Sequence, residues 1–100
     1  MSQEEIITNI KEAIDEDPNK NYIQSISLFG SFLHGDANPN SDIDLLLEMK
    51  KPMSLFEIFS IQKNLEKKLC RKVDLIEKVS LDKYIKNEII AGAKKIYENQ

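Results

Sequence analysis

The segment 41–47, of sequence SDIDLLL, constrains the fold more than any other part of the chain. Its apolar second half is typical of a buried strand, but it begins with two aspartates, which are disfavoured in strands. Because side chains alternate along a strand, Asp42 and Asp44 should project from the same face, with their Cα atoms about 7 Å apart. The apolar residues of the segment then point into a core on the opposite face: Ile43, Leu45 and Leu47.

Two carboxylates held side by side repel each other, and partial burial increases that cost. A divalent cation relieves it, and Mg²⁺ takes carboxylate oxygens and completes its coordination with water and substrate phosphates. A pair of such ions, bridged by shared carboxylates, can stabilise both the attacking and the leaving oxygen in phosphoryl chemistry. Asp42 and Asp44 are therefore candidate metal ligands. The alternative is that both are solvated residues at the start of a strand.

A third aspartate stands within another short apolar run, VDLI at 73–76. If this predicted strand lies beside the one that carries Asp42 and Asp44, Asp74 could supply a third metal ligand. It could also accept the proton of an attacking hydroxyl group. Taken alone, Asp74 fits an ordinary carboxylate on an edge strand.

Gly30 and Ser31 directly follow the alternating pattern of a predicted strand at 23–29. A glycine lets the backbone approach a phosphate closely. A helix that started here would direct free N–H groups and the positive end of its dipole at that phosphate, and the Ser31 hydroxyl could add a contact. The alternative is an ordinary Gly-Ser turn.

The remaining patterns predict a small α/β (α+β) fold, a mixed sheet with helices packed mainly on one face. Apolar periodicity indicates helices over about 3–15, 54–69 and 80–90, and strands over 23–29, 42–48, 72–76 and 95–97. Ser2 with Glu5, and Ser54 with Glu57, predict capping boxes at two helix starts. The middle helix is expected to bury one apolar face: Leu55, Ile58, Phe59, Leu65 and Leu69.

Length and composition favour a single domain over 1–100, in the cytoplasm. No apolar stretch is long enough to cross a bilayer, and no basic segment precedes an apolar one at the start. The net charge is −3 and the lysines are spread along the chain, which argues against direct nucleic-acid binding. The single cysteine, Cys70, falls at an apolar helix position and is expected to be buried.

Taken together, Gly30-Ser31, ten residues, Asp42-x-Asp44 and a later Asp74 resemble the motif of the polymerase-β-like nucleotidyltransferases. The chain most closely resembles the minimal nucleotidyltransferases that act as antitoxins beside HEPN-domain toxins. This resemblance implies a palm-like nucleotidyltransferase fold. It also implies that Gly30 and Ser31 hold the triphosphate of ATP and that Asp42 and Asp44 bind Mg²⁺. Asp74 would be the third carboxylate, both a metal ligand and a candidate base.

The family activity is transfer of AMP from ATP to a hydroxyl group, with release of pyrophosphate. In the antitoxin group the acceptor is a tyrosine of the HEPN ribonuclease toxin. One departure is that relatives often carry arginine where this chain has His34. Arginine is always charged and binds phosphate with two donors, whereas histidine is largely neutral near pH 7. His34 could contact nucleotide or lie in solvent, and Arg71 could reach phosphate or cap a helix end.

Only twenty-six residues follow Asp74, too few for a separate acceptor-binding domain. A second protein is therefore expected to bring the acceptor, in a hetero- or homo-oligomer. One rival hypothesis is a non-catalytic antitoxin that masks its toxin through surface hydrophobic residues. Another is a small-molecule nucleotidyltransferase whose acceptor pocket needs a partner or dimer. Candidate masking residues are Phe32, Leu33, Met53 and Phe56.

Overall fold

A computed structural model describes residues 2–30, 42–81 and 83–99. The predicted strands appear within one or two residues of their expected limits, whereas the last helix begins two or three residues later than expected. Two short 3₁₀ helices, η1 and η2, were not predicted. In chain order the elements are α1 (Gln3–Asp15), η1 (Lys20–Tyr22), β1 (Ile23–Phe29), β2 (Ile43–Met49), α3 (Leu55–Leu69), β3 (Val73–Glu77), η2 (Lys78–Ser80), α4 (Lys83–Gly92) and β4 (Lys94–Glu98).

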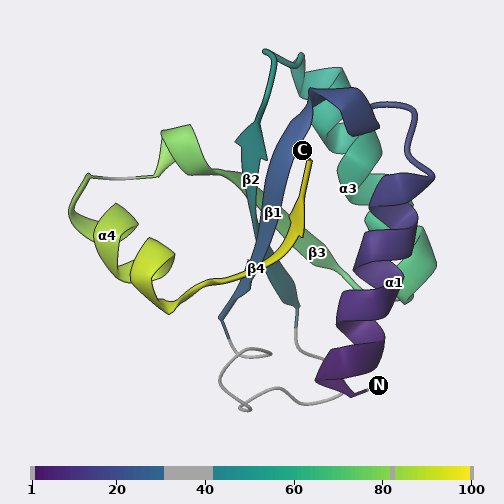
Figure 1. Cartoon of the computed structure of the whole chain (residues 1–100), viewed down its shortest axis with the longest axis horizontal. Coiled ribbons are helices and arrows are strands. Elements are labelled where there is room, and N and C mark those ends of the chain that lie inside the picture. Colours follow the sequence, from purple (N-terminus) through teal and green to yellow (C-terminus); the bar gives the residue numbers. More distant parts are fainter. Residues whose placement is uncertain (1, 31–41, 82, 100) are drawn as a thin grey trace.

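The four strands form one mixed sheet in the order β3-β2-β1-β4. β1 is antiparallel to both β2 and β4, whereas β2 and β3 are parallel. A parallel pair needs a crossover connection. Here that connection is α3, which carries the chain from the end of β2 back to the start of β3 (Figure 1).

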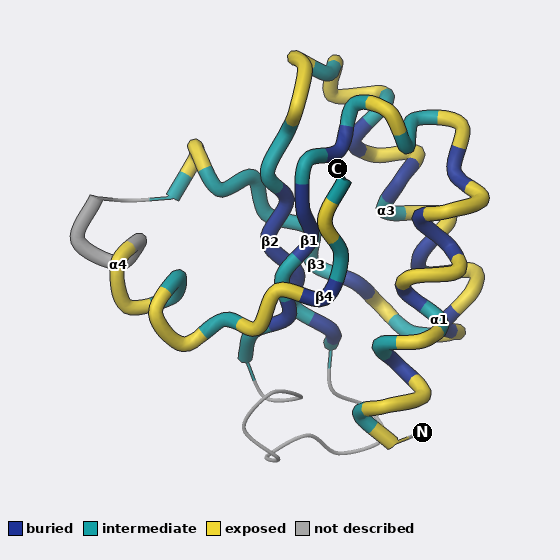
Figure 2. Tube along the Cα trace, in the orientation of Figure 1, coloured by how far each residue is buried: buried dark blue, intermediate teal, exposed yellow. Residues whose placement is uncertain are grey.

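Helices α1 and α3 pack together on one face of the sheet, which confirms the prediction that the helices pack mainly on one face (Figure 1). α4 lies on the other side of the sheet, away from these two helices. In Figure 2 the buried residues gather between the sheet and the α1–α3 pair. The core combines one stripe of each helix with alternate residues of the strands, among them Ile6, Ile10, Ile14, Ile26, Leu28, Ile43, Leu45, Ile61, Leu65 and Val73.

Both long helices begin at the predicted serine caps. The Ser2 hydroxyl accepts a hydrogen bond from the Glu5 backbone N–H at 3.2 Å. At α3 the capping box is complete, because Ser54 accepts from the Glu57 N–H at 3.2 Å and the Glu57 carboxylate accepts from the Ser54 N–H at 2.9 Å. Such caps satisfy N–H groups that have no partner inside the helix.

The predicted buried face of α3 was wrong at two positions. Leu55 and Phe59 are 80% and 56% exposed. The apolar stripe that enters the core begins later, and it contains Ile58, Ile61, Leu65 and Leu69. Leu55 lies in the first turn, before that stripe begins. Phe59 is turned about 100° from Ile58 around the helix axis, and it packs under the Lys63 ammonium, which is 5.0 Å from the centre of its ring.

Cys70 was also wrongly predicted to be buried. It is exposed, and it ends α3 in the left-handed conformation with φ of 54°. A residue in this conformation turns the chain out of the helix, so its side chain leaves the apolar stripe. Elsewhere, no helix of the described residues is long and apolar enough to cross a membrane.

Candidate active site

The parallel pairing of β2 with β3 places Asp44 directly opposite Asp74. Ile43 and Val73 form the preceding pair, and both are fully buried under α1 and α3. Because side chains alternate along strands, Asp44 and Asp74 lie on the opposite face, which α1 and α3 do not cover, and Asp42 is expected there too. The sequence left open whether these strands were neighbours, and the observed register brings the two carboxylates together.

Burial and the neighbouring carboxylates both affect the pKa of Asp44. Burial raises the pKa of the Asp44 carboxyl above its usual range, and the neighbouring Asp74 raises it further, both by its charge and by a hydrogen bond. The charge of Asp42 acts in the same direction. Two carboxyl groups can share a hydrogen bond only when one of them holds a proton. Without a cation, this arrangement therefore disfavours full ionisation.

The Asp44 carboxylate also restricts which residue can stand at position 30. Its φ is +79°, in the left-handed region that side chains rarely adopt. A Cβ at this position would collide with Asp44 Oδ2 and lie 3.1 Å from Asp44 Cγ. Phe29, the residue before Gly30, is the cross-strand partner of Asp44. The end of β1 therefore approaches Asp44 so closely that only glycine fits.

Sequence reasoning missed Lys72. Its Nζ lies 3.9 Å from Asp42 Oδ2, and its backbone carbonyl accepts a hydrogen bond from the Ile43 N–H at 3.0 Å. It stands two residues before Asp74, so strand alternation applied to Asp74 would have placed it on the carboxylate face. The Lys72 side chain is 68% exposed, and such an ion pair contributes little to stability. Its position does, however, add a positive charge beside Asp42.

Ser31 and His34 lie outside the described residues, as do Phe32 and Leu33. Arg71 is half-buried and lies two residues before β3.

The donor chemistry of the site fits Mg²⁺. Asp42, Asp44 and Asp74 offer only carboxylate oxygens, the ligands that this hard cation prefers. Within 2–30, 42–81 and 83–99, no three His, Cys, Asp or Glu side chains converge as a preformed metal site.

Two named relatives match most of the chain. A Methanocaldococcus jannaschii protein named provisionally as a protein adenylyltransferase (MJ0126) is 35% identical over 86 residues, which cover 85% of each chain. The protein adenylyltransferase MntA of Thermococcus cleftensis is 32% identical over 68 residues, which cover 68% of this chain and 69% of that protein.

Solved structures with the same fold are more distant in sequence. A toxin–antitoxin structure with AMP-PNP matches with a TM-score of 0.77 and 22% identity, covering 94% of this chain and 74% of that one. A complex of the tri-AMPylated Shewanella oneidensis HEPN toxin with its MNT antitoxin matches with a TM-score of 0.71 and 20% identity, covering 98% and 74%. Residues 8–100 match the family described as polymerase beta, nucleotidyltransferase, and the chain belongs to that family.

Proposed function

We propose that this protein is an adenylyltransferase that moves AMP from Mg²⁺-bound ATP to a tyrosine hydroxyl of a HEPN-domain toxin and so silences it. The observation that carries the proposal is the pairing of Asp44 with Asp74 on the face opposite α1 and α3, beside Gly30. Relatives named as protein adenylyltransferases, and a fold shared with an antitoxin bound to an AMPylated HEPN toxin, support the acceptor. Because the reaction consumes ATP, we expect it in the cytoplasm.

In this proposal Asp42, Asp44 and Asp74 would hold the metal, as one ion or two. Mg²⁺ at this position would neutralise the phosphates and stabilise the charge that develops on them. Gly30 brings the backbone at the end of β1 close to Asp44, so its peptide groups can approach the triphosphate. The Ser31 hydroxyl is proposed as a second triphosphate contact.

The acceptor oxygen attacks the α-phosphorus of ATP, forming a new P–O bond. The bond between the α-phosphorus and the bridging oxygen breaks, and pyrophosphate leaves with its electrons. Asp74 is proposed to take the proton of the acceptor hydroxyl. It suits this role because β3 is the outermost strand, so an acceptor can approach it from the sheet edge.

The rival function is a binding module that neutralises its toxin without chemistry. One observation favours it: the first turns of α3 expose Leu55, Phe56 and Phe59 by 80%, 88% and 56%. Isolated exposed hydrophobic residues are common, but grouped ones often mark protein interfaces. These three side chains follow the end of β2, whereas Asp44 lies near its beginning. Substitutions near the start of β2 and near the start of α3 can therefore distinguish catalysis from masking.

The deciding experiment uses ATP labelled on its α-phosphate, Mg²⁺ and a HEPN toxin encoded beside this protein. We would compare wild type, the Asp42→Asn/Asp44→Asn double mutant and Phe56→Ser. Label on the toxin with wild type and Phe56→Ser, but not with the double mutant, is the expected result. Protein present in less than one-to-one amounts should still silence the toxin, because an enzyme turns over.

A different pattern would support masking. There, no label appears on the toxin, neutralisation needs one protein per toxin, and the double mutant neutralises as well as wild type. Loss of neutralisation in Phe56→Ser alone would place the essential contact on α3. Label on a small molecule instead of the toxin would show that the small molecule, and not the toxin, is the acceptor.

A further inference from the structure

A cavity of about 200 Å³ lies on the face of the sheet opposite α1 and α3, outside the cluster of aspartates. Ser25 and Ser27 of β1 and Leu46 of β2 line its floor. Ile90 and Ala93, where α4 leads into β4, line another side. Pockets that enclose a drug-sized ligand measure roughly 300–1,000 Å³. This cavity therefore suits one part of a ligand, such as a single ring system.

The cavity continues the face that carries the candidate catalytic aspartates. Asp44, Leu46 and Glu48 alternate along β2 and so share that face. Cross-strand pairs align Leu46 with Ser27, and Glu48 with Ser25. By the rise per residue, these two pairs lie about 7 Å and 13 Å from Asp44 along the strand. A ligand extending from Asp44 along β2 would enter the cavity.

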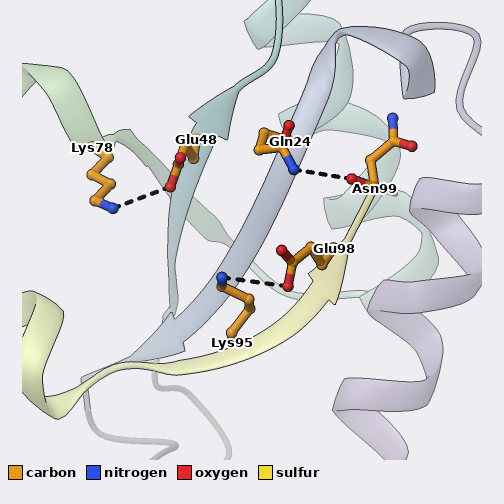
Figure 3. A network of polar contacts seen from close by, with 6 residues as sticks. All are labelled: Gln24, Glu48, Lys78, Lys95, Glu98 and Asn99. Carbon is orange, nitrogen blue, oxygen red and sulfur yellow. Dashed lines mark hydrogen bonds and ion pairs between the residues drawn. The ribbon is translucent and has the colours of Figure 1, made fainter.

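Polar groups surround Leu46, the apolar residue of the floor. Leu46 is only 4% exposed, and Ser25 beside it is equally buried. Lys78 donates to the Glu48 carboxylate at 3.1 Å, and Figure 3 shows this pair extending from η2 to β2. Because a carboxylate accepts several hydrogen bonds, Glu48 keeps capacity for a ligand donor. Lys95, which also lines the cavity, pairs with Glu98 at 3.4 Å (Figure 3).

We propose that this cavity binds the adenine ring of ATP, an inference that rests on the proposed function. If Gly30 faces the triphosphate and Asp44 the α-phosphate, the nucleoside can extend along β2 from that end. The flat ring then packs on Leu46, and its exocyclic amino group donates to Glu48. Guanine has a carbonyl oxygen at the corresponding position, which would face the Glu48 carboxylate unfavourably. Glu48 would thus select ATP over GTP.

The test compares two polyphosphates, only one of which carries a base. Calorimetry with Mg²⁺ would measure the Kd of ATP and of inorganic tripolyphosphate. Ala93→Leu fills the cavity, and Ala91→Leu is its matched control, because Ala91 is exposed and does not line the cavity. We expect Ala93→Leu to weaken ATP binding at least tenfold and leave tripolyphosphate binding unchanged. Ala91→Leu should change neither, and thermal melts would check the folding of both variants.

A second variant tests the hydrogen bond. Glu48→Gln should narrow the preference for ATP over GTP, because its amide can donate to guanine as well as accept from adenine. A preference that stays unchanged would overturn the role of Glu48.

The outcomes also separate this inference from the proposed function. If wild type binds ATP and tripolyphosphate, and Ala93→Leu binds both normally, the cavity does not hold adenine, but the adenylyltransferase proposal survives. If Ala93→Leu binds ATP normally but no longer labels the toxin, the cavity receives the acceptor and the inference is wrong. If wild type binds neither compound, both proposals fail.

Discussion

The carboxylate of Asp44 fills the space that a side chain on Gly30 would need. Gly30→Ala should therefore push the Asp44 carboxylate aside and force alanine into a left-handed conformation. The left-handed backbone costs about 1–2 kcal/mol for a non-glycine residue, and the overlap adds a cost of similar size. We expect a lower free energy of unfolding in urea, together with loss of most AMP transfer.

Gly92→Ala is the matched control for this variant. Gly92 ends α4, and a Cβ there would meet no atom within 4 Å. Alanine is favoured over glycine in helices by up to about 1 kcal/mol. Gly92→Ala should therefore be neutral or slightly stabilising. If both variants lost the same free energy of unfolding, the flexibility of glycine, rather than the Gly30–Asp44 contact, would explain the effect of Gly30→Ala.

Asp44→Asn should remove activity but increase stability near neutral pH. The folded protein raises the pKa of Asp44, so it binds this proton more tightly than the unfolded chain does. The contribution of Asp44 to stability is thus fully present below its unfolded pKa and is lost as pH rises through its folded pKa. Asparagine stays neutral and avoids this loss.

Thermal melts across the acidic to neutral range check the sign. Asp44→Asn should melt above wild type near pH 7, and the difference should disappear as pH falls below the unfolded pKa of aspartate, about 3.9. AMP transfer near pH 7 should fall by at least about 100-fold, as when a group that stabilises a transition state is removed. A variant less stable than wild type near pH 7 would contradict the repulsion between Asp44 and Asp74.

Adding Mg²⁺ should stabilise wild type more than Asp44→Asn. A ligand that binds only the folded state stabilises it by about 2.7 kcal/mol at one hundred times its Kd. Melting curves at increasing Mg²⁺, with and without EDTA, measure this effect. Equal shifts in both proteins would mean that the ion binds away from Asp44.

Lys72→Met should alter the metal and nucleotide affinities in opposite directions. The Lys72 ammonium lies 3.9 Å from Asp42, where it competes with a metal ion and attracts phosphate. An exposed pair of this kind is worth up to about 1 kcal/mol, so Mg²⁺ affinity should rise by up to roughly fivefold. The KM for ATP should increase. Lys68→Met is the control, since Lys68 instead pairs with Glu12 at 3.3 Å.

Local patterns predicted much of this fold because they depend on neighbours in sequence. Strand alternation predicted that Asp44 lies on the face of the sheet opposite the core residues of its strand. The Ser54–Glu57 spacing predicted the start of α3. Contacts between distant segments were not predictable in this way. The approach of Gly30 to Asp44 depends on the register in which β1 pairs with β2. The exposure of Phe59 depends on where α3 rests against the sheet.

Glu66 is another residue whose role only the tertiary structure reveals. Its carboxylate accepts a hydrogen bond from the Val73 N–H at 3.0 Å and so ties α3 to the start of the edge strand β3. This bond lowers the pKa of Glu66, with smaller contributions from Lys63 and Lys72.

A lowered folded pKa of Glu66 gives stability that is present above the unfolded pKa and is lost as pH falls through the folded pKa. Glu66→Gln should therefore cost about 1 kcal/mol near pH 7 and progressively less at acidic pH, measured as urea midpoints. Glu12→Gln, which removes only an exposed pair with Lys68, should cost much less. If the two variants lose the same stability at every pH, the Glu66–Val73 bond contributes no more than a surface charge.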